Sequence, residues 1–138
     1  MSRNVGHALA GLHHARAAER SQALFYRALA SMAEDAEDAV LAERLNGLHA
    51  DEQHHLSRLS ARLLELGERL TDLGPPDLPE VGLESWEQLA RAREEVEIDR
   101  YDALLQQEMD DDTRVLIESF ARAERHHAAS LGGKWMDA

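Results

Sequence analysis

Two copies of a Glu-x-x-His motif are the residues in this chain best placed to do chemistry. Glu52 is followed three residues later by His55, and Glu124 is followed three residues later by His127. Residues three apart on an α-helix project from the same face, so each motif would present a carboxylate beside an imidazole. Carboxylate and imidazole ligands, with no thiolate, suit iron or manganese better than copper. The two motifs therefore indicate a metal site.

Other polar residues repeat in the same way. Glu19 is followed seven residues later by Tyr26, and Glu94 is followed seven residues later by Tyr101. Any two helical hairpins repeat their apolar spacing, but Glu and His inside an apolar stripe are unusual, because they are rarely buried unless paired or bound to a metal. The repeat predicts that both halves of the chain contribute ligands.

Four amphipathic helices are predicted to position these side chains. Apolar residues recur every three or four positions in four stretches, two on each side of the proline-containing segment Thr71–Leu83. The acidic stretches Glu34–Asp38 and Asp110–Asp112 offer N-cap side chains for the second and fourth helices. Ala, Leu, Glu and Arg are abundant, and they favour helix. We expect a single all-α domain over residues 1–138, with two antiparallel hairpins joined by a crossover at about residues 70–84.

The acidic residues are expected to be level across each hairpin. Residues equidistant from a tight turn lie at the same height, and the midpoint of Glu19 and Glu52 falls within the first acidic stretch. On the third helix Glu94 and Glu97 are both candidates to face Glu124, and Glu97 is the better match by midpoint. Glu from two helices and Glu-x-x-His from two others is the ligand set of a two-metal bundle. Four carboxylates would neutralise two divalent ions in a low-dielectric interior.

The composition excludes several classes of function. The net charge of −12 disfavours a nucleic acid or an anionic membrane surface as partner. The chain contains no cysteine, which excludes a disulfide, a thiolate zinc site and an iron–sulfur centre within it. No stretch approaches the roughly 20 apolar residues of a membrane span, and residues 1–12 lack the apolar run of a signal peptide. A cytoplasmic location is expected.

The order Glu, Glu-x-x-His, Glu, Glu-x-x-His resembles the ferritin-like superfamily. Within it, the Glu-x₆-Tyr spacing and the additional acid Glu97 resemble the rubrerythrins. The resemblance implies a ferritin-like four-helix bundle that holds two iron ions, with manganese or a mixed iron–manganese pair as the alternative. It implies metal ligation by Glu19, Glu52, His55, Glu94, Glu97, Glu124 and His127.

The same resemblance implies an oxidoreductase that reduces hydrogen peroxide or dioxygen. Glu97, Tyr26 and Tyr101 are the expected catalytic residues, although both tyrosines could equally be core residues with hydrogen-bonded hydroxyl groups. Full-length rubrerythrins carry a four-cysteine rubredoxin domain, and this cysteine-free sequence does not, so an external electron-donor protein is expected. A homodimer is also expected. The alternatives are ferroxidation with iron storage or delivery, and a bundle that keeps its ligands for stability alone. His49 is expected to be a packing residue, with alternate metal ligand as the other possibility.

Overall fold

The computed structural model describes residues 3–76 and 78–131, and the side chains among them from residue 8 onward. Four α-helices follow one another: α1 (Arg3–Asp35), α2 (Ala39–Glu65), α3 (Trp86–Leu104) and α4 (Asp111–Ser130). The described ranges contain no strand. None of the described helices is both long enough and apolar enough to cross a membrane. The prediction of two helical hairpins, α1·α2 and α3·α4, is confirmed.

The chain divides into two compact units. One comprises Arg16–Trp86, and the other comprises Met1–Ala15 together with Glu87–Ala138. The first unit thus contains most of α1, all of α2 and the crossover. The second contains the start of α1 and the α3·α4 hairpin.

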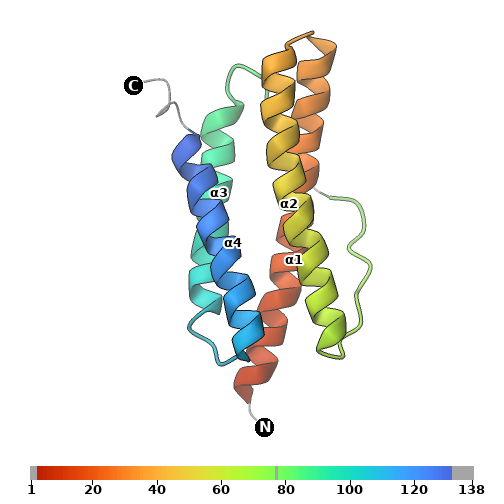
Figure 1. The fold of residues 1–138 in the computed structure, drawn as a ribbon. Coiled ribbons are helices and arrows are strands. Elements are labelled where there is room, and N and C mark those ends of the chain that lie inside the picture. The colour runs from red at the N-terminus through yellow and green to blue at the C-terminus, as the bar shows by residue number, and fades with distance from the viewer. Residues whose placement is uncertain (1–2, 77, 132–138) are drawn as a thin grey trace. The chain divides into compact units, whose positions relative to one another are not determined.

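A tight acidic turn joins α1 to α2 in the first unit (Figure 1). The side chain of Asp38 accepts a hydrogen bond from the backbone N–H of Leu41 at 3.1 Å, which satisfies one of the free donors at the start of α2. Glu37 completes the turn with a φ of 59°. The predicted N-cap is therefore confirmed. Large buried side chains fill this hairpin: Phe25, Tyr26, Leu29, Leu45, Leu59 and Leu63.

The crossover is longer than predicted and occupies residues 66–85. Helix α2 ends early because Gly67 adopts a φ of 85°, a left-handed conformation that favours glycine. The N–H of Gly67 then donates to the carbonyl of Leu64, and the N–H of Glu68 donates to that of Leu63. These bonds satisfy the last carbonyl groups of the helix in the manner of a Schellman motif.

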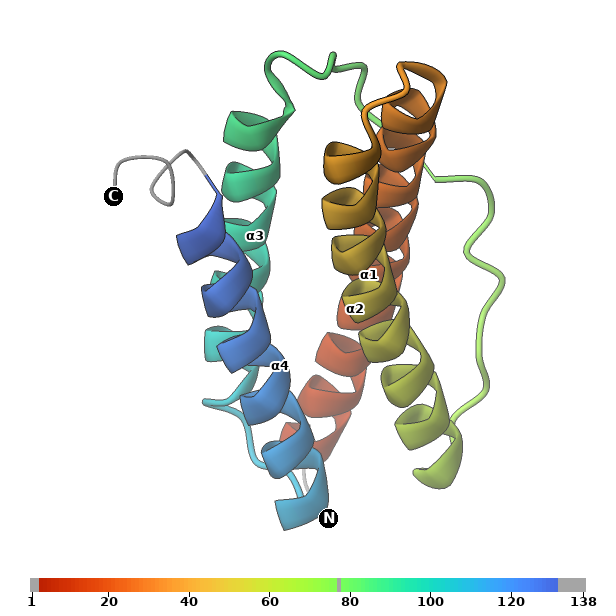
Figure 2. The same ribbon diagram turned by 45° about the horizontal axis from the view of Figure 1, so that its top comes forward.

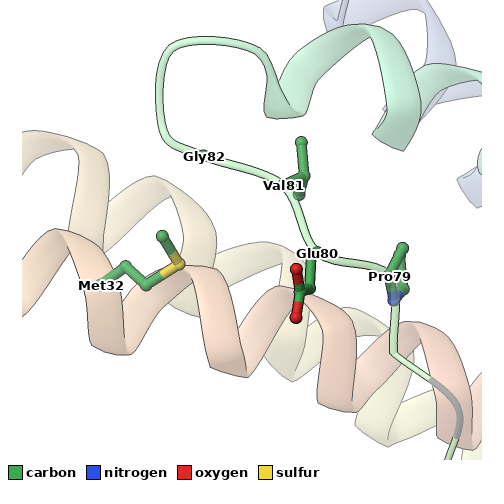
Figure 3. Close-up of a pocket in the computed structure, with 5 residues that line it drawn as sticks. All are labelled: Met32, Pro79, Glu80, Val81 and Gly82. Carbon is green, nitrogen blue, oxygen red and sulfur yellow. The ribbon is translucent and has the colours of Figure 1, made fainter.

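The crossover runs back along α1. Arg16 donates to the carbonyl oxygen of Thr71 at 3.1 Å, and Arg20 donates to that of Gly74. Farther along, the segment 79–82 lies beside Met32 and lines with it a surface hollow of about 520 Å³ (Figure 3). Successive contacts move toward the end of α1, so the crossover returns over the length of the hairpin, as the sequence predicted.

A short loop joins α3 to α4 in the second unit (Figure 2). Asp110 caps α4 by accepting from the backbone N–H of Thr113 at 3.0 Å and from its hydroxyl at 2.7 Å, which confirms the second predicted N-cap. Arg114 fixes the loop by donating to the carbonyl groups of Leu105 and Gln107. The buried side chains of this unit include Leu12, Tyr101, Leu104, Ile117, Phe120 and Leu131.

Candidate metal centre

The interior of this protein is unusually rich in ionisable groups. All of the predicted ligands are buried, with exposed fractions of 5% or less, and so is one further polar side chain on α1: Glu19, Glu52, His55, Glu94, Glu97, Glu124, His127 and Gln22. Removing an ionised carboxylate from water costs several kcal/mol unless a cation or hydrogen bonds compensate. So many buried acids on so few helical faces are typical of a site for cations.

The first group lies in the α1·α2 hairpin. Nδ1 of His55 lies 3.2 Å from Oε2 of Glu19 and 3.4 Å from Oε1 of Glu52. These three residues, which we call the α1·α2 triad, each offer one ligand atom, and the three atoms lie within 4.8 Å of one another. Helix register explains the arrangement. Glu52 and His55 share one face of α2, and Glu19 lies level with them across the turn.

The second group lies in the α3·α4 hairpin. Nδ1 of His127 lies 3.0 Å from Oε1 of Glu124 and 3.6 Å from Oε2 of Glu94. These three residues form the α3·α4 triad, and their ligand atoms also lie within 4.8 Å of one another. The two triads have the same composition and the same connectivity, as the internal repeat predicted.

Each triad has a donor set that fits a divalent cation. Both imidazoles turn Nδ1, the same ring atom, toward the two carboxylates of their own triad. Nδ1 is therefore the nitrogen that would ligate a metal, and it must then carry no proton. Two carboxylates balance the charge of one divalent ion in each triad. Oxygen and imidazole donors without thiolate match iron and manganese.

Glu97 has a different environment from the triad residues. It is 5% exposed, and its Oε2 accepts a hydrogen bond from Nη1 of Arg100 at 2.6 Å. Burial, the largest cause, together with the nearby Glu124 and Glu94 carboxylates, raises the pKa of Glu97 to about 7 against the opposing effect of Arg100. In this structure Glu94 belongs to the triad and Glu97 is ion-paired. Ligation by Glu97 stays a prediction.

Tyr26 and Tyr101 are both fully buried. The ring centroid of Tyr101 lies 6.0 Å from that of Phe120, a tilted aromatic contact of the kind that stabilises a core. A catalytic role for either tyrosine stays a prediction. His49 is half-buried, and its Nδ1 lies 2.8 Å from the carbonyl oxygen of Ala23, which fits the packing role expected for it.

Gln22 and Arg100 lie beside the triad residues but were not predicted from the sequence as site residues. Gln22 is 1% exposed and lies three residues after Glu19, as Glu97 lies three residues after Glu94. The repeat that aligns Glu19 with Glu94 therefore also aligns Gln22 with Glu97. That signal was present in the sequence. Nothing comparable pointed to Arg100.

A crystal structure of ferritin-like, diiron-carboxylate proteins from Bacillus anthracis strain Ames is similar to this chain. It aligns with a TM-score of 0.83 and 23% identity, over 94% of this chain and 96% of that one. The likeness shows the fold, an all-α ferritin-like four-helix bundle with two hairpins joined by a long crossover. No protein-family model matches the sequence, and no curated protein matches it.

Proposed function

We propose that each triad binds one iron ion, so that the chain holds two, and that the bound iron reduces hydrogen peroxide or dioxygen. The observation that carries the proposal is the duplicated triad, with Nδ1 of His55 and of His127 each directed at two buried carboxylates. The likeness to a diiron-carboxylate protein of the same fold supports it. Four carboxylates and two neutral imidazoles balance two divalent cations.

The bound iron pair would supply two electrons, one from each ferrous ion, and with two protons these convert one hydrogen peroxide into two water molecules. The protein groups hold the metals and exclude bulk water, since every triad residue is 5% exposed or less. Glu97 is the proposed proton carrier. Its Oε2 accepts from Arg100, so a proton on this carboxyl group resides on Oε1. Tyr26 and Tyr101 are the other proposed catalytic residues.

Electrons must return to the centre from outside the chain, which has no cysteine to hold an iron–sulfur cluster. We therefore propose an external electron-donor protein as partner. A homodimer is the proposed assembly. The donor protein follows from the requirement for re-reduction, and the homodimer from the small size and the Ala- and Leu-rich helices of the chain.

The test begins with metal-free protein loaded anaerobically with ferrous iron. We expect about two ions per chain, and near-ultraviolet absorption that grows as peroxide is consumed. His55→Gln should lose this response, whereas His54→Gln is a matched control, because His54 is its exposed neighbour on α2. The same comparison applies to His127→Gln and His126→Gln. Loading without any change on adding peroxide or dioxygen would exclude the proposed reaction while leaving the metal site intact.

Ferroxidation with iron storage or delivery is the second candidate, and the net charge of −12 favours it because an acidic surface attracts cations. Storage needs a cage of many subunits. Size exclusion decides between the two candidates: a monomer or dimer that retains about two irons per chain excludes storage. A large assembly that retains many ferric ions per chain would support it.

A further inference from the structure

The internal repeat breaks at one position beside each triad. On α1 the buried residues Glu19 and Tyr26 flank Gln22, and on α3 the corresponding Glu94 and Tyr101 flank Glu97. Gln22 is 1% exposed and Glu97 is 5% exposed. One hairpin thus places a neutral amide where the other places an acid.

The break extends one helical turn farther along both helices. Three residues after Gln22 lies Phe25, which is 2% exposed and has its ring centroid 5.4 Å from that of Tyr26. Three residues after Glu97 lies Arg100, whose Nη1 is 2.6 Å from Oε2 of Glu97. The acid and the guanidinium occur together on α3, and the matching positions of α1 carry neither. A guanidinium at this position therefore accompanies the extra carboxylate and is not a general feature of the repeat.

The Glu97–Arg100 ion pair joins a buried carboxylate to a partly solvent-exposed guanidinium. The side chain of Glu97 is 6% exposed, whereas that of Arg100 is 34% exposed. A guanidinium on the rim can turn into water at little cost when its partner leaves, but the buried carboxylate needs another cation when it loses Arg100. A metal held by the neighbouring Glu94, Glu124 and His127 would be that cation.

We propose that Arg100 is a positioning residue that competes with the metal for Glu97. The inference rests on the proposed metal centre and adds a specific regulator to it. With Arg100 in place, Glu97 ligates the metal of the α3·α4 triad only when the ion pair opens. The α1·α2 triad, with Gln22 and Phe25 at the matching positions, has no such competition. The two metal positions are therefore unequal.

Titration of the metal-free protein with Co²⁺ under anaerobic conditions tests the competition. We expect Arg100→Gln to tighten one of the two binding steps by about tenfold, the range in which groups that contact a ligand alter metal affinity. The matched control is Arg125→Gln. It also removes one positive charge from this hairpin, but Arg125 pairs at 2.6 Å with the exposed Asp102. The control should leave both steps unchanged.

A double-mutant cycle supplies the second arm. In a Glu97→Gln background, Arg100→Gln should no longer change Co²⁺ affinity, because the carboxylate that it releases is gone. Arg100→Lys keeps the charge without the planar fork and should lie between wild type and Arg100→Gln. Arg100→Lys also provides the test of competition if Arg100→Gln does not fold. Equal effects of Arg100→Gln and Arg125→Gln, or an effect that persists without Glu97, would overturn this inference alone. Absence of Co²⁺ binding in wild type would overturn the metal centre as well.

Discussion

Nδ1 of His127 lies 3.0 Å from Oε1 of Glu124, one helical turn earlier on α4. The matching atoms of His55 and Glu52 on α2 lie 3.4 Å apart. The same ring nitrogen faces an acid in both hairpins, so helix register sets which imidazole nitrogen a metal would meet. The number of protons that metal binding releases from these nitrogens is therefore a quantity to measure.

Metal binding should release protons. Nδ1 of His55 lies 3.2 Å from Oε2 of Glu19 and 3.4 Å from Oε1 of Glu52, and two carboxylates this close favour an imidazole that carries a proton on both nitrogens. A metal that binds Nδ1 would then release that proton to solvent. We expect about one proton per imidazole ligand near neutral pH. Calorimetry with Co²⁺ in two buffers of different ionisation enthalpy measures the number. His55→Gln should lower it by about one, while His54→Gln should not change it. An apparent enthalpy that is the same in both buffers would contradict a doubly protonated imidazole in the metal-free protein.

Removal of metal should lower the thermal stability. A metal at 100 times its dissociation constant stabilises the folded state by about 2.7 kcal/mol, since the triads exist only in the folded chain. For a domain of this size we expect Tm to fall by roughly 10 °C on chelation. Differential scanning calorimetry with and without a chelator checks this. Glu52→Gln should show a smaller shift, because one carboxylate of the α1·α2 triad is neutralised. Gln53→Glu is the control, since Gln53 is the exposed next residue.

The sequence predicted the helices and the partners within the α1·α2 hairpin because both follow from spacing. Equal distances from the first acidic turn placed Glu19 level with Glu52, and in the structure both acids lie beside His55. On α3 the midpoint favoured Glu97, whereas the acid beside His127 in the structure is Glu94. The end of α2 was less well predicted. Leu66 and Leu70 continue the apolar spacing beyond the helix, while the backbone turns at Gly67.

The choice of counter-ion for Glu97 could not be predicted from spacing. Arg93 lies four residues before it and Arg100 three residues after it, and helix geometry allows either pair. Side-chain orientation decides between them, and the structure selects Arg100. Whether Glu94, Glu97 or both ligate depends on the bound metal. Which of the two acids is the main ligand of α3 therefore stays a prediction.

The metal-free protein should become less stable, relative to a Glu97→Gln variant, as the pH rises from 5 to 8. Burial, the largest cause, raises the pKa of Glu97 from its ordinary value of 4.5 to about 7. The folded state therefore retains a proton that the unfolded state loses. The contribution of Glu97 to the free energy of unfolding is fully present below about pH 4.5, and it is lost as the pH rises through about 7. The relative change is about 3 kcal/mol at most.

Urea unfolding in the presence of a chelator, at pH 5 and at pH 8, measures this difference. Glu95→Gln is the matched control, because the Glu95 side chain is 57% exposed and lies beside Glu94 on α3. Its free energy of unfolding should keep a constant offset from wild type at both pH values. A constant offset for Glu97→Gln as well would contradict a raised pKa.

Gln22→Glu should make the α1·α2 hairpin more like the α3·α4 hairpin, but without its counter-ion. The new carboxylate would be buried at a position that is 1% exposed, with Phe25 where Arg100 stands in the other half. We expect the metal-free variant to lose about 3 kcal/mol of stability at pH 8, the cost of an uncompensated buried charge. Saturating Mn²⁺ should recover most of the lost stability, since the added carboxylate can ligate the metal or balance its charge. Gln22→Met, similar in size and uncharged, is the control. Thermal unfolding of both variants with and without Mn²⁺ makes the comparison, and an equal gain from Mn²⁺ in the two variants would show that position 22 does not reach the metal.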